Sequence, residues 1–373
     1  MLTSLNVRCA IFLAGVFAFA PPLAFAQGAL TTTRNASDER LTVGRGGDYW
    51  TADRIKEAQP LPWYDQDKDL GAGAALQLGV APVGPPDSAP GGNPGANQAP
   101  PRASGAGSAN PLANEEAADD DAIPDDQDTA IDFGSQDIGD GYPANKTIFY
   151  QKQYPWRTTG KLFFTAASGG SSYCTASVVS GNNIVVTAAH CCYDRGVGSF
   201  HSNWSFAPAI RNNNRPYGTF PYQQARVLTS WITSGGRQND VCVLQMGPNA
   251  AGQSLSSRTG WLGRSWNFPT VQHHFDFGYP GNLDAGNFSE TCAAETYANC
   301  GDPNVLAMGC NMTFGSSGGP WLRVYKPHEI GNKNFVNAVV SGYDGCTGTF
   351  GQSFNGPRFT SDNIVILCNA QGC

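Results

Sequence analysis

The 373-residue sequence is poor in charged side chains and contains no run of basic residues. Charged residues make up 14% of the chain, against 45 glycines and 25 prolines, which argues against a coiled coil or a helical bundle. Without a Lys/Arg run, nucleic acid is not an expected partner. Beyond the N-terminus no stretch is long and apolar enough to span a bilayer, so we expect no membrane partner either.

Cysteine is absent between Cys9 and Cys174, although the chain contains 11 cysteines. No C-x₂-C pair occurs, which argues against a zinc site. The cysteines from Cys174 onward are even in number, and in an exported chain this is typical of a disulfide framework. We expect neither a bound metal nor a cofactor.

The N-terminus has the order of a secretory signal peptide. Arg8 is followed by the apolar run Ala10–Ala20, then by Pro21-Pro22 and the small-residue site Ala24-Phe25-Ala26. A retained membrane anchor would need about 20 apolar residues, more than this run contains. We therefore expect residues 1–26 to be removed and the protein to be secreted: extracellular, or periplasmic if it comes from a bacterium with an outer membrane.

Charge divides the rest of the chain near residue 141. Residues 27–141 carry 20 acidic and 7 basic side chains, whereas residues 142–373 carry 10 acidic and 15 basic ones. Gly, Ala and Pro dominate 71–113, and a dense acidic run fills 115–140, so we expect 27–141 to be a largely disordered pro-region. Its opposite charge favours association with the basic part. Four aromatic residues in it are candidates for a small interaction element: Tyr49, Trp50, Trp63 and Tyr64.

The section 142–373 has the pattern of an all-β domain. Short β-rich runs alternate with Gly, Asn and Ser; the predicted strands are Lys161–Ala166, Thr175–Val179, Ile184–Thr187, Val241–Met246, Pro320–Tyr325 and Phe335–Val340. Ser361 is the predicted cap of a short terminal helix over Asn363–Leu367. The length suits one large core or two small barrels.

The strongest chemical signal is Phe314-Gly315-Ser316-Ser317-Gly318-Gly319-Pro320. Glycines here let backbone N–H groups turn inward and bind an oxyanion beside a serine hydroxyl. The same residues match G-x-S-x-G, the nucleophile elbow of α/β-hydrolases. That class needs an acid and then a histidine after the serine. Only His328 follows Ser317, with no Asp or Glu between them, so chain order rejects an esterase of that class.

The order His, Asp, Ser is present instead. Thr187-Ala188-Ala189-His190-Cys191 ends an apolar run, and Asp240-Val241-Cys242-Val243-Leu244 begins another. Followed by Gly315–Pro320, these motifs resemble the trypsin-like (chymotrypsin-fold) serine peptidases over about 150–365. Further stretches are similar to the secreted glutamyl endopeptidase-like branch: Lys161–Phe164, Asn203–Phe206, Pro216–Gly218 and Gly278–Pro280.

The resemblance implies two six-stranded antiparallel β-barrels with a short C-terminal helix, and a monomeric serine endopeptidase acting on protein or peptide substrates. Ser317 is the implied nucleophile, His190 its base and Asp240 the residue that orients His190. The backbone N–H groups of Gly315 and Ser317 are the implied oxyanion hole. Asp240 is also open to interpretation as an ordinary turn residue, and the whole chain as a catalytically inactive binding or adhesion protein on a peptidase fold.

The sequence departs from that family at several positions. Ser316 stands where most members have the Asp that receives a new N-terminus, so the usual activation ion pair is not expected. The substrate-binding residues implied by the resemblance are Asn311, Ser341, Gly342 and Tyr343. Because Asn311 is uncharged and no histidine stands at Val340 or Ser341, neither a basic-residue nor a glutamate preference is expected. We expect removal of the pro-region by cleavage near 130–150.

The implied disulfides are Cys174–Cys191 and Cys310–Cys346, with a third, Cys192–Cys242, suggested by the nearness of these cysteines to His190 and Asp240. A metal site at His273, His274 and Asp276 is the alternative to a solvated loop. The absence of a helical His-x₃-His spacing favours the loop.

Overall fold

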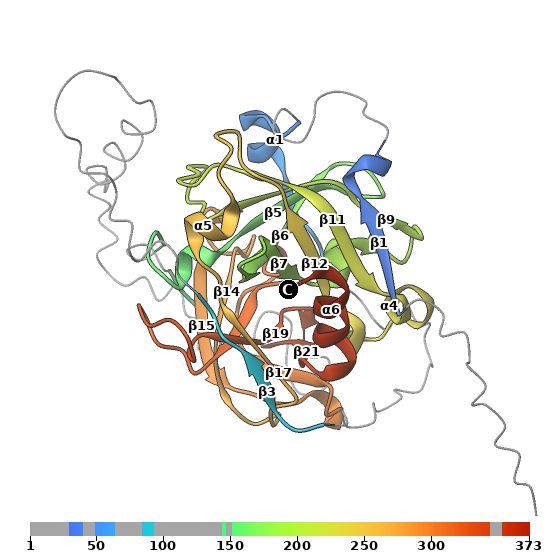
Figure 1. Cartoon of the computed structure of the whole chain (residues 1–373), viewed down its shortest axis with the longest axis vertical. Helices are drawn as coiled ribbons and strands as arrows, with labels where there is room; N and C mark the ends of the chain where they lie inside the picture. The colour runs from blue at the N-terminus through green and yellow to red at the C-terminus, as the bar shows by residue number, and fades with distance from the viewer. Residues whose placement is uncertain (1–29, 40–48, 64–83, 93–143, 147–150, 344–352) are drawn as a thin grey trace, which may run out of the picture.

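The computed structural model of the chain describes residues 30–39, 49–63, 84–92, 144–146, 151–343 and 353–373. The predicted signal peptide, the acidic run 115–140 and most of the expected cleavage range lie outside these residues, as does Cys346. From residue 151 onward, strands and short turns dominate, and the few helices are short (Figure 1).

The first barrel is a closed ring of antiparallel strands. It contains β5 (Thr159–Thr165), β6 (Ser171–Ser180), β7 (Ile184–Thr187), β10 (Ser202–Pro208), β11 (Phe220–Leu228) and β12 (Cys242–Met246). The strand order is β11-β10-β5-β6-β7-β12, and β12 pairs back with β11. Apolar side chains fill the interior, among them Leu162, Phe164, Val178, Val186, Phe206 and Leu244. This ring confirms the expected six-stranded barrel.

The second half contains another six-strand ring, built from two sheets. The strands are β14 (His273–Gly278), β15 (Glu290–Glu295), β17 (Val305–Gly309), β18 (Pro320–Arg323), β19 (Phe335–Val339) and β21 (Ser353–Pro357). One sheet runs β19-β18-β14-β15, and the other pairs β17 with β21. An isolated bridge from Ala338 to Arg358 joins β19 to the end of β21. The disulfide Cys292–Cys310 joins β15 to the end of β17, so the ring is completed there by a covalent bond.

Short elements flank these rings. The strands β16 (Tyr297–Ala298) and β20 (Gly342–Tyr343) extend the β17–β21 sheet. The strand β13 (Gly263–Trp266) pairs with β19 in parallel, unlike the antiparallel pairing within the rings. Other short elements are β4 (Asn145–Lys146), β8 (Tyr193–Asp194), β9 (Ser199–Phe200), α4 (Thr229–Ser234) and α5 (Leu255–Thr259).

Strand and helix ends differ from the prediction for local reasons. The strand predicted over Pro320–Tyr325 stops at Arg323, because Val324 has a positive φ of 50° that interrupts extended backbone. At the C-terminus a π-helical turn, Ser361–Val365, precedes α6 (Ile366–Gln371). The cap is Thr360, whose side chain accepts from Asp362 N, so the prediction of Ser361 was wrong by one residue.

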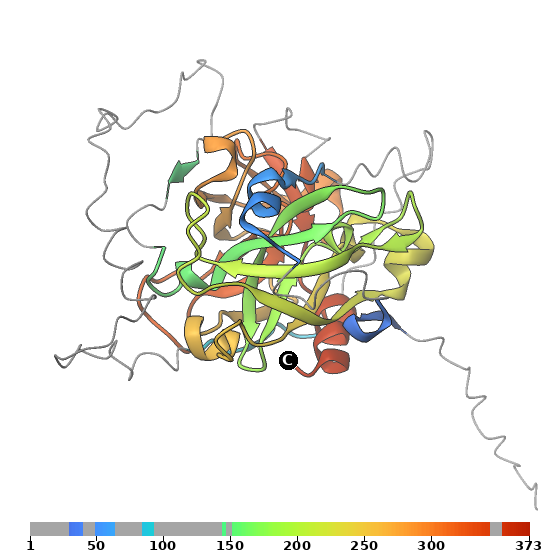
Figure 2. The same cartoon turned by 90° about the horizontal axis from the view of Figure 1, so that it is seen from above.

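Three segments of the expected pro-region are folded onto the barrels. The strand β1 (Thr31–Asn35) pairs antiparallel with β11, from Thr31 opposite Leu228 to Asn35 opposite Gln224. The strand β2 (Gln59–Pro60) pairs with β6, and β3 (Asp87–Ala89) pairs with β13. Helix α1 (Ala52–Glu57) lies beside β6, on the outside of the first barrel (Figures 1 and 2). The disorder expected for 27–141 therefore does not extend to these segments.

Aromatic side chains anchor the folded N-terminal segments. Trp50 is buried, its ring lies 5.5 Å from that of Phe163, and its indole N–H donates to Asn203 O. Ile55 and Trp63 are buried as well. These few large side chains bury enough apolar area to hold their segments on the barrel. The average composition of residues 27–141 does not show this, because such side chains are rare in it.

Candidate active site

Adjacent strands bring His190 and Asp240 together. His190 lies in the 3₁₀ turn η4 (Ala189–Cys191), which follows the end of β7. Asp240 follows the 3₁₀ turn η5 (Arg237–Asn239) and precedes β12. Because Thr187 of β7 pairs with Cys242 of β12, the residues just beyond these strand ends lie side by side.

His190, Asp240 and Ser317 form one hydrogen-bonded line. His190 Nδ1 lies 2.8 Å from Asp240 Oδ2, and His190 Nε2 lies 2.8 Å from Ser317 Oγ. The backbone N–H of His190 also donates to Asp240 Oδ1 at 2.8 Å. Asp240 is fully buried and Ser317 has 0% exposed surface.

This line selects the tautomer of the imidazole. A carboxylate only accepts hydrogen bonds, so the contact with Asp240 requires the proton on His190 Nδ1. The lone pair of Nε2 then faces the Ser317 hydroxyl. The arrangement can take the proton from Ser317 Oγ as that oxygen attacks an acyl group.

The backbone around Ser317 is held by β6. Thr175 N donates to Ser317 O at 2.8 Å, and Thr175 Oγ1 donates to Gly315 O at 2.9 Å. Ser316 N donates to Thr313 O, which closes a turn with Gly315 at a φ of 92°. The carbonyl groups of Gly315 and Ser317 are thus bound by Thr175. The N–H groups of the same two residues donate to no acceptor among the described residues.

Glycine is required beside the serine. A Cβ at Gly318, whose φ is 82°, would lie 2.0 Å from Thr187 Oγ1 and 2.3 Å from Thr175 O. No larger residue fits there without moving the strands that carry the site. The glycine pattern of the sequence thus has a steric cause.

Ser341 contacts the acidic end of the line. Its Oγ donates to Asp240 Oδ2 at 2.5 Å, and an Arg237 guanidinium nitrogen lies 3.3 Å from the same hydroxyl. The sequence assigned Ser341 to substrate binding and did not single out Arg237. Nothing in the local pattern signals this contact, because Ser341 follows an apolar strand far from Asp240 in sequence.

The other expected pocket residues have varied surroundings. Asn311 Oδ1 accepts from the backbone N–H of Ala144 at 2.8 Å, so this oxygen is already hydrogen-bonded within the protein. Gly342 and Tyr343 form β20, and the Tyr343 side chain is 37% exposed. Ser316 is buried and donates to Thr313 O at 2.6 Å.

A second histidine supports His190 from behind. Ala167 N donates to His201 Nδ1, so His201 Nε2 carries the proton and donates to His190 O at 2.9 Å. The His201 ring stacks on Phe164 with the centroids 4.7 Å apart. Burial lowers the pKa of His201 to about 4, which keeps the ring neutral. Sequence reasoning missed this residue because nothing around it forms a motif.

Disulfides flank the site. Cys174–Cys191 and Cys192–Cys242 are formed, as predicted. The predicted Cys310–Cys346 bond is wrong, because Cys310 is bonded to Cys292 on the neighbouring strand. Cys368–Cys373 closes the C-terminus, and Cys300 is also disulfide-bonded.

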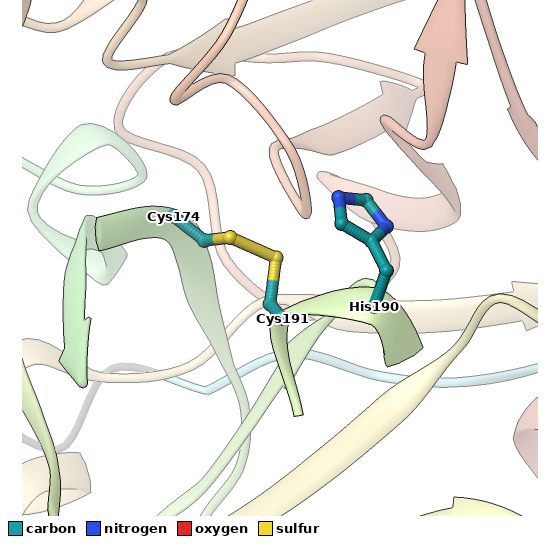
Figure 3. A group of neighbouring side chains, drawn as sticks. All are labelled: Cys174, His190 and Cys191. Atoms are coloured by element: carbon teal, nitrogen blue, oxygen red, sulfur yellow. A yellow bond between two sulfur atoms is a disulfide. The ribbon is translucent and has the colours of Figure 1, made fainter. Parts of the chain in front are cut away.

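Within the described residues, one group of side chains has the spacing of a metal site: Cys174, His190 and Cys191. Figure 3 shows that the two sulfur atoms are bonded to each other beside the imidazole. A disulfide offers no thiolate, so these residues do not fit a metal ion.

The His273-His274 segment is not a solvated loop. Both residues lie in strand β14, where alternation leaves His273 exposed and buries His274 and Asp276. Burial lowers the pKa of His274 to about 4 and raises that of Asp276 well above its usual value. The loop prediction was wrong because polar residues occupy both faces of this strand, so the sequence lacks the apolar/polar alternation that predicts a strand.

Comparisons with known proteins agree with this geometry. Residues 149–355 match the Trypsin protein family. The Glutamyl endopeptidase of Bacillus licheniformis is 26% identical over 194 residues, which cover 44% of this chain and 58% of that protein. The match thus spans little more than half of that relative's length.

Solved structures share the fold. The protease Anisep from Arthrobacter nicotinovorans has a TM-score of 0.51 at 28% identity, covering 57% of this chain and 94% of that one. The thermostable serine protease AL20 from an extremophilic microorganism has a TM-score of 0.52 at 24% identity, covering 58% and 97%. At that identity the second likeness concerns the fold alone. Of the helices in the described part of the chain, none has the length and apolarity to cross a membrane.

Proposed function

Because the chain belongs to the trypsin family of serine peptidases, we propose that it is a secreted serine endopeptidase. Its substrates are proteins or peptides, and it cleaves them through an acyl-enzyme. The observation that carries the proposal is the line of hydrogen bonds from Asp240 through His190 to Ser317 Oγ. A serine hydroxyl is a poor nucleophile unless a neutral imidazole can accept its proton.

In the first step Ser317 Oγ attacks the peptide carbonyl carbon while His190 Nε2 takes the hydroxyl proton. The imidazolium then gives this proton to the leaving amine, and the C–N bond breaks. In the second step a water molecule loses a proton to His190 and attacks the acyl carbon. The bond from that carbon to Ser317 Oγ then breaks, and the imidazolium returns the proton to Oγ, which regenerates the hydroxyl. Asp240 holds the imidazole in orientation and stabilises its positive charge.

The charge that develops on the carbonyl oxygen needs donors that point at it. The N–H groups of Gly315 and Ser317 serve as this oxyanion hole, supported by the turn at Thr313–Ser316. Losing one such donor typically costs about 10²–10³ in rate.

A charge-based preference at the cleaved bond is not part of the proposal. Asn311 brings no carboxylate to select Arg or Lys, and its oxygen is bonded to Ala144 N. The name of the Bacillus relative, Glutamyl endopeptidase, indicates a glutamate preference. That preference is not proposed for this chain, because no histidine stands at Val340 or Ser341. Gly342 and Tyr343 are the remaining substrate-binding candidates. A cleavage profile on a peptide library measures the preference directly.

The organisation of the chain completes the proposal. Residues 1–26 are the signal peptide, 27–141 the pro-region and 142–373 the peptidase domain, which acts as a monomer. The four disulfides formed within the described residues fit an oxidising compartment outside the cytosol. N-terminal sequencing of the secreted protein tests the expected cleavage near 130–150; a start at Gln27 rejects it.

A fluorophosphonate probe tests the catalytic assignment. The probe forms a covalent bond with an activated serine, so we expect labelling of the secreted protein and none in Ser317→Ala. Ser316→Ala is the matched control, because this neighbouring hydroxyl bonds Thr313 O and should not be needed for labelling. Absence of labelling in correctly processed protein would assign the chain to the alternative class of inactive binding or adhesion proteins.

A further inference from the structure

A short N-terminal segment is added to the edge of the strand that supports the serine loop. Gln59 and Pro60 pair in parallel with Ser172 and Tyr173 of β6, and Leu61 N donates to Tyr173 O at 3.0 Å. β7 pairs with β6 only from Ser177 onward, so this part of the edge is open to another chain. Such an edge binds extended peptides through its main-chain groups.

The added segment lies next to the reacting groups. Tyr173 is two residues from Thr175, which holds Ser317 O and Gly315 O. The Tyr173 ring packs on Gly315, since a Cβ there would lie 2.8 Å from a ring carbon. A peptide bound at Tyr173 O is therefore a neighbour of the proposed oxyanion hole.

The segment also contacts the serine loop from the second barrel. A Cβ on Gly281 would lie 2.7 Å from Pro60 Cγ, and Gly281 N donates to Phe314 O at 2.7 Å. The Trp63 ring meets the Phe314 ring edge-on, with the centroids 5.9 Å apart. Trp63 is only 7% exposed and belongs to the buried cluster that contains Met312. Residues 59–63 thus reach from β6 to the loop that carries Ser317.

We propose that residues 59–63, defined here as the cover segment, occupy a binding groove for extended peptides between Tyr173 and Phe314 and limit access to Ser317. The inference rests on the proposed peptidase function. The complete burial of Ser317 fits this arrangement, because a substrate carbonyl must reach Oγ.

Cleavage near 130–150 would not by itself release the cover segment. The β1–β11 pairing and the buried Trp50 hold the preceding residues to the first barrel without a peptide bond to residue 142. Full activity then requires that the cover segment be displaced or digested, in addition to the cut.

The test is the rate of fluorophosphonate labelling of the full chain carrying Trp63→Ala. We expect labelling to be several-fold faster than in the wild type, because the Phe314 contact is lost. kcat/KM should rise similarly for a long peptide, and less for a nitroanilide without residues after the cleaved bond. Lys56→Ala, an exposed change in α1, is the control and should leave both rates unchanged. An unchanged rate in folded Trp63→Ala overturns the proposal, and a fall would instead make Trp63 part of the substrate-binding wall.

A cross-link provides the opposite perturbation. The Cβ position at Gly281 lies 3.1 Å from Pro60 Cβ, so an outward shift of about 0.5 Å would bring the pair to disulfide geometry in Pro60→Cys/Gly281→Cys. The oxidised double variant should label several-fold more slowly than either single variant. Equal rates in the locked and single variants would overturn the cover role.

Hydrogen exchange separates this inference from the proposed function. If no form reacts with the probe, the peptidase proposal fails, and the exchange of the Leu61 amide still decides the docking. A protected amide that loses protection in Trp63→Ala supports the cover segment. Rapid exchange in the wild type overturns it.

Discussion

The disulfide between Cys192 and Cys242 should contribute more to stability than any of the other three disulfides formed within the described residues. It joins the residue two after His190 to the residue two after Asp240, with a sequence separation of 50. The loop-entropy relation gives about 4 kcal/mol for a loop of this size. The perturbation is the double variant Cys192→Ala/Cys242→Ala.

A short-loop bond in the same molecule is the control. Cys368–Cys373 has a sequence separation of 5, for which the same relation gives about 2 kcal/mol. At about 2–4 °C per kcal/mol for a domain of this size, Tm should fall by about 8–16 °C in the first variant and about half of that in Cys368→Ala/Cys373→Ala.

Thermal unfolding of all three proteins should be measured with Ser317→Ala in the background, which prevents self-digestion. Activity is measured separately with Ser317 present, well below Tm. There kcat should fall only modestly, because the His190 N–Asp240 Oδ1 bond and the β7–β12 pairing remain. The reasoning is refuted if removing the disulfide Cys368–Cys373 lowers Tm as much as removing Cys192–Cys242.

Three further predictions concern single side chains. Ser341→Ala removes a hydrogen bond to buried Asp240 worth about 1.5–3 kcal/mol, so kcat should fall about 10–100-fold with KM little changed. Steady-state kinetics showing the reverse would return Ser341 to a substrate-binding role. His201→Ala strands two buried backbone groups and should cost about 1–3 kcal/mol in denaturant unfolding. Since the pKa of His201 falls from 6.5 to about 4 on folding, the wild type should lose stability as pH drops through this window, a slope that the variant lacks. Burial, with Asp284 beside it, raises the pKa of Glu290 from 4.5 to about 8. Stability from Glu290 is therefore lost as pH rises toward 8, and thermal unfolding of Glu290→Gln should show a flatter profile between these values.

The first barrel and the line at Ser317 could be predicted because their signals are local. Ile184–Thr187 is a continuous apolar run and was placed to the residue. The glycines around Ser317 are required by close contacts with β6 and β7, and they lie together within five residues, so their spacing is visible in the sequence although its cause is long-range. Chain order then selected His190 and Asp240.

Long-range pairings could not be predicted. Thr31 pairs with Leu228 across about half of the chain, and no local pattern indicates such a partner. The disulfide partner of Cys310 depends on which strand lies beside β17, and sequence alone leaves many pairings among the cysteines open. The contact of Ser341 with Asp240 could not be predicted for the same reason, since it is created by the packing of the two halves.

The β1–β11 pairing has a consequence for producing the peptidase domain alone. β10 pairs with only the first residues of β11, Phe220 and Pro221, while β1 covers Gln224–Leu228. A recombinant protein that begins at residue 142 would leave this row of backbone donors and acceptors open, and an open edge recruits other chains. Unlike the processed monomer, in which β1 stays paired with β11, such a protein should self-associate in a concentration-dependent way. A synthetic peptide spanning residues 30–39 should suppress this association by replacing the missing strand.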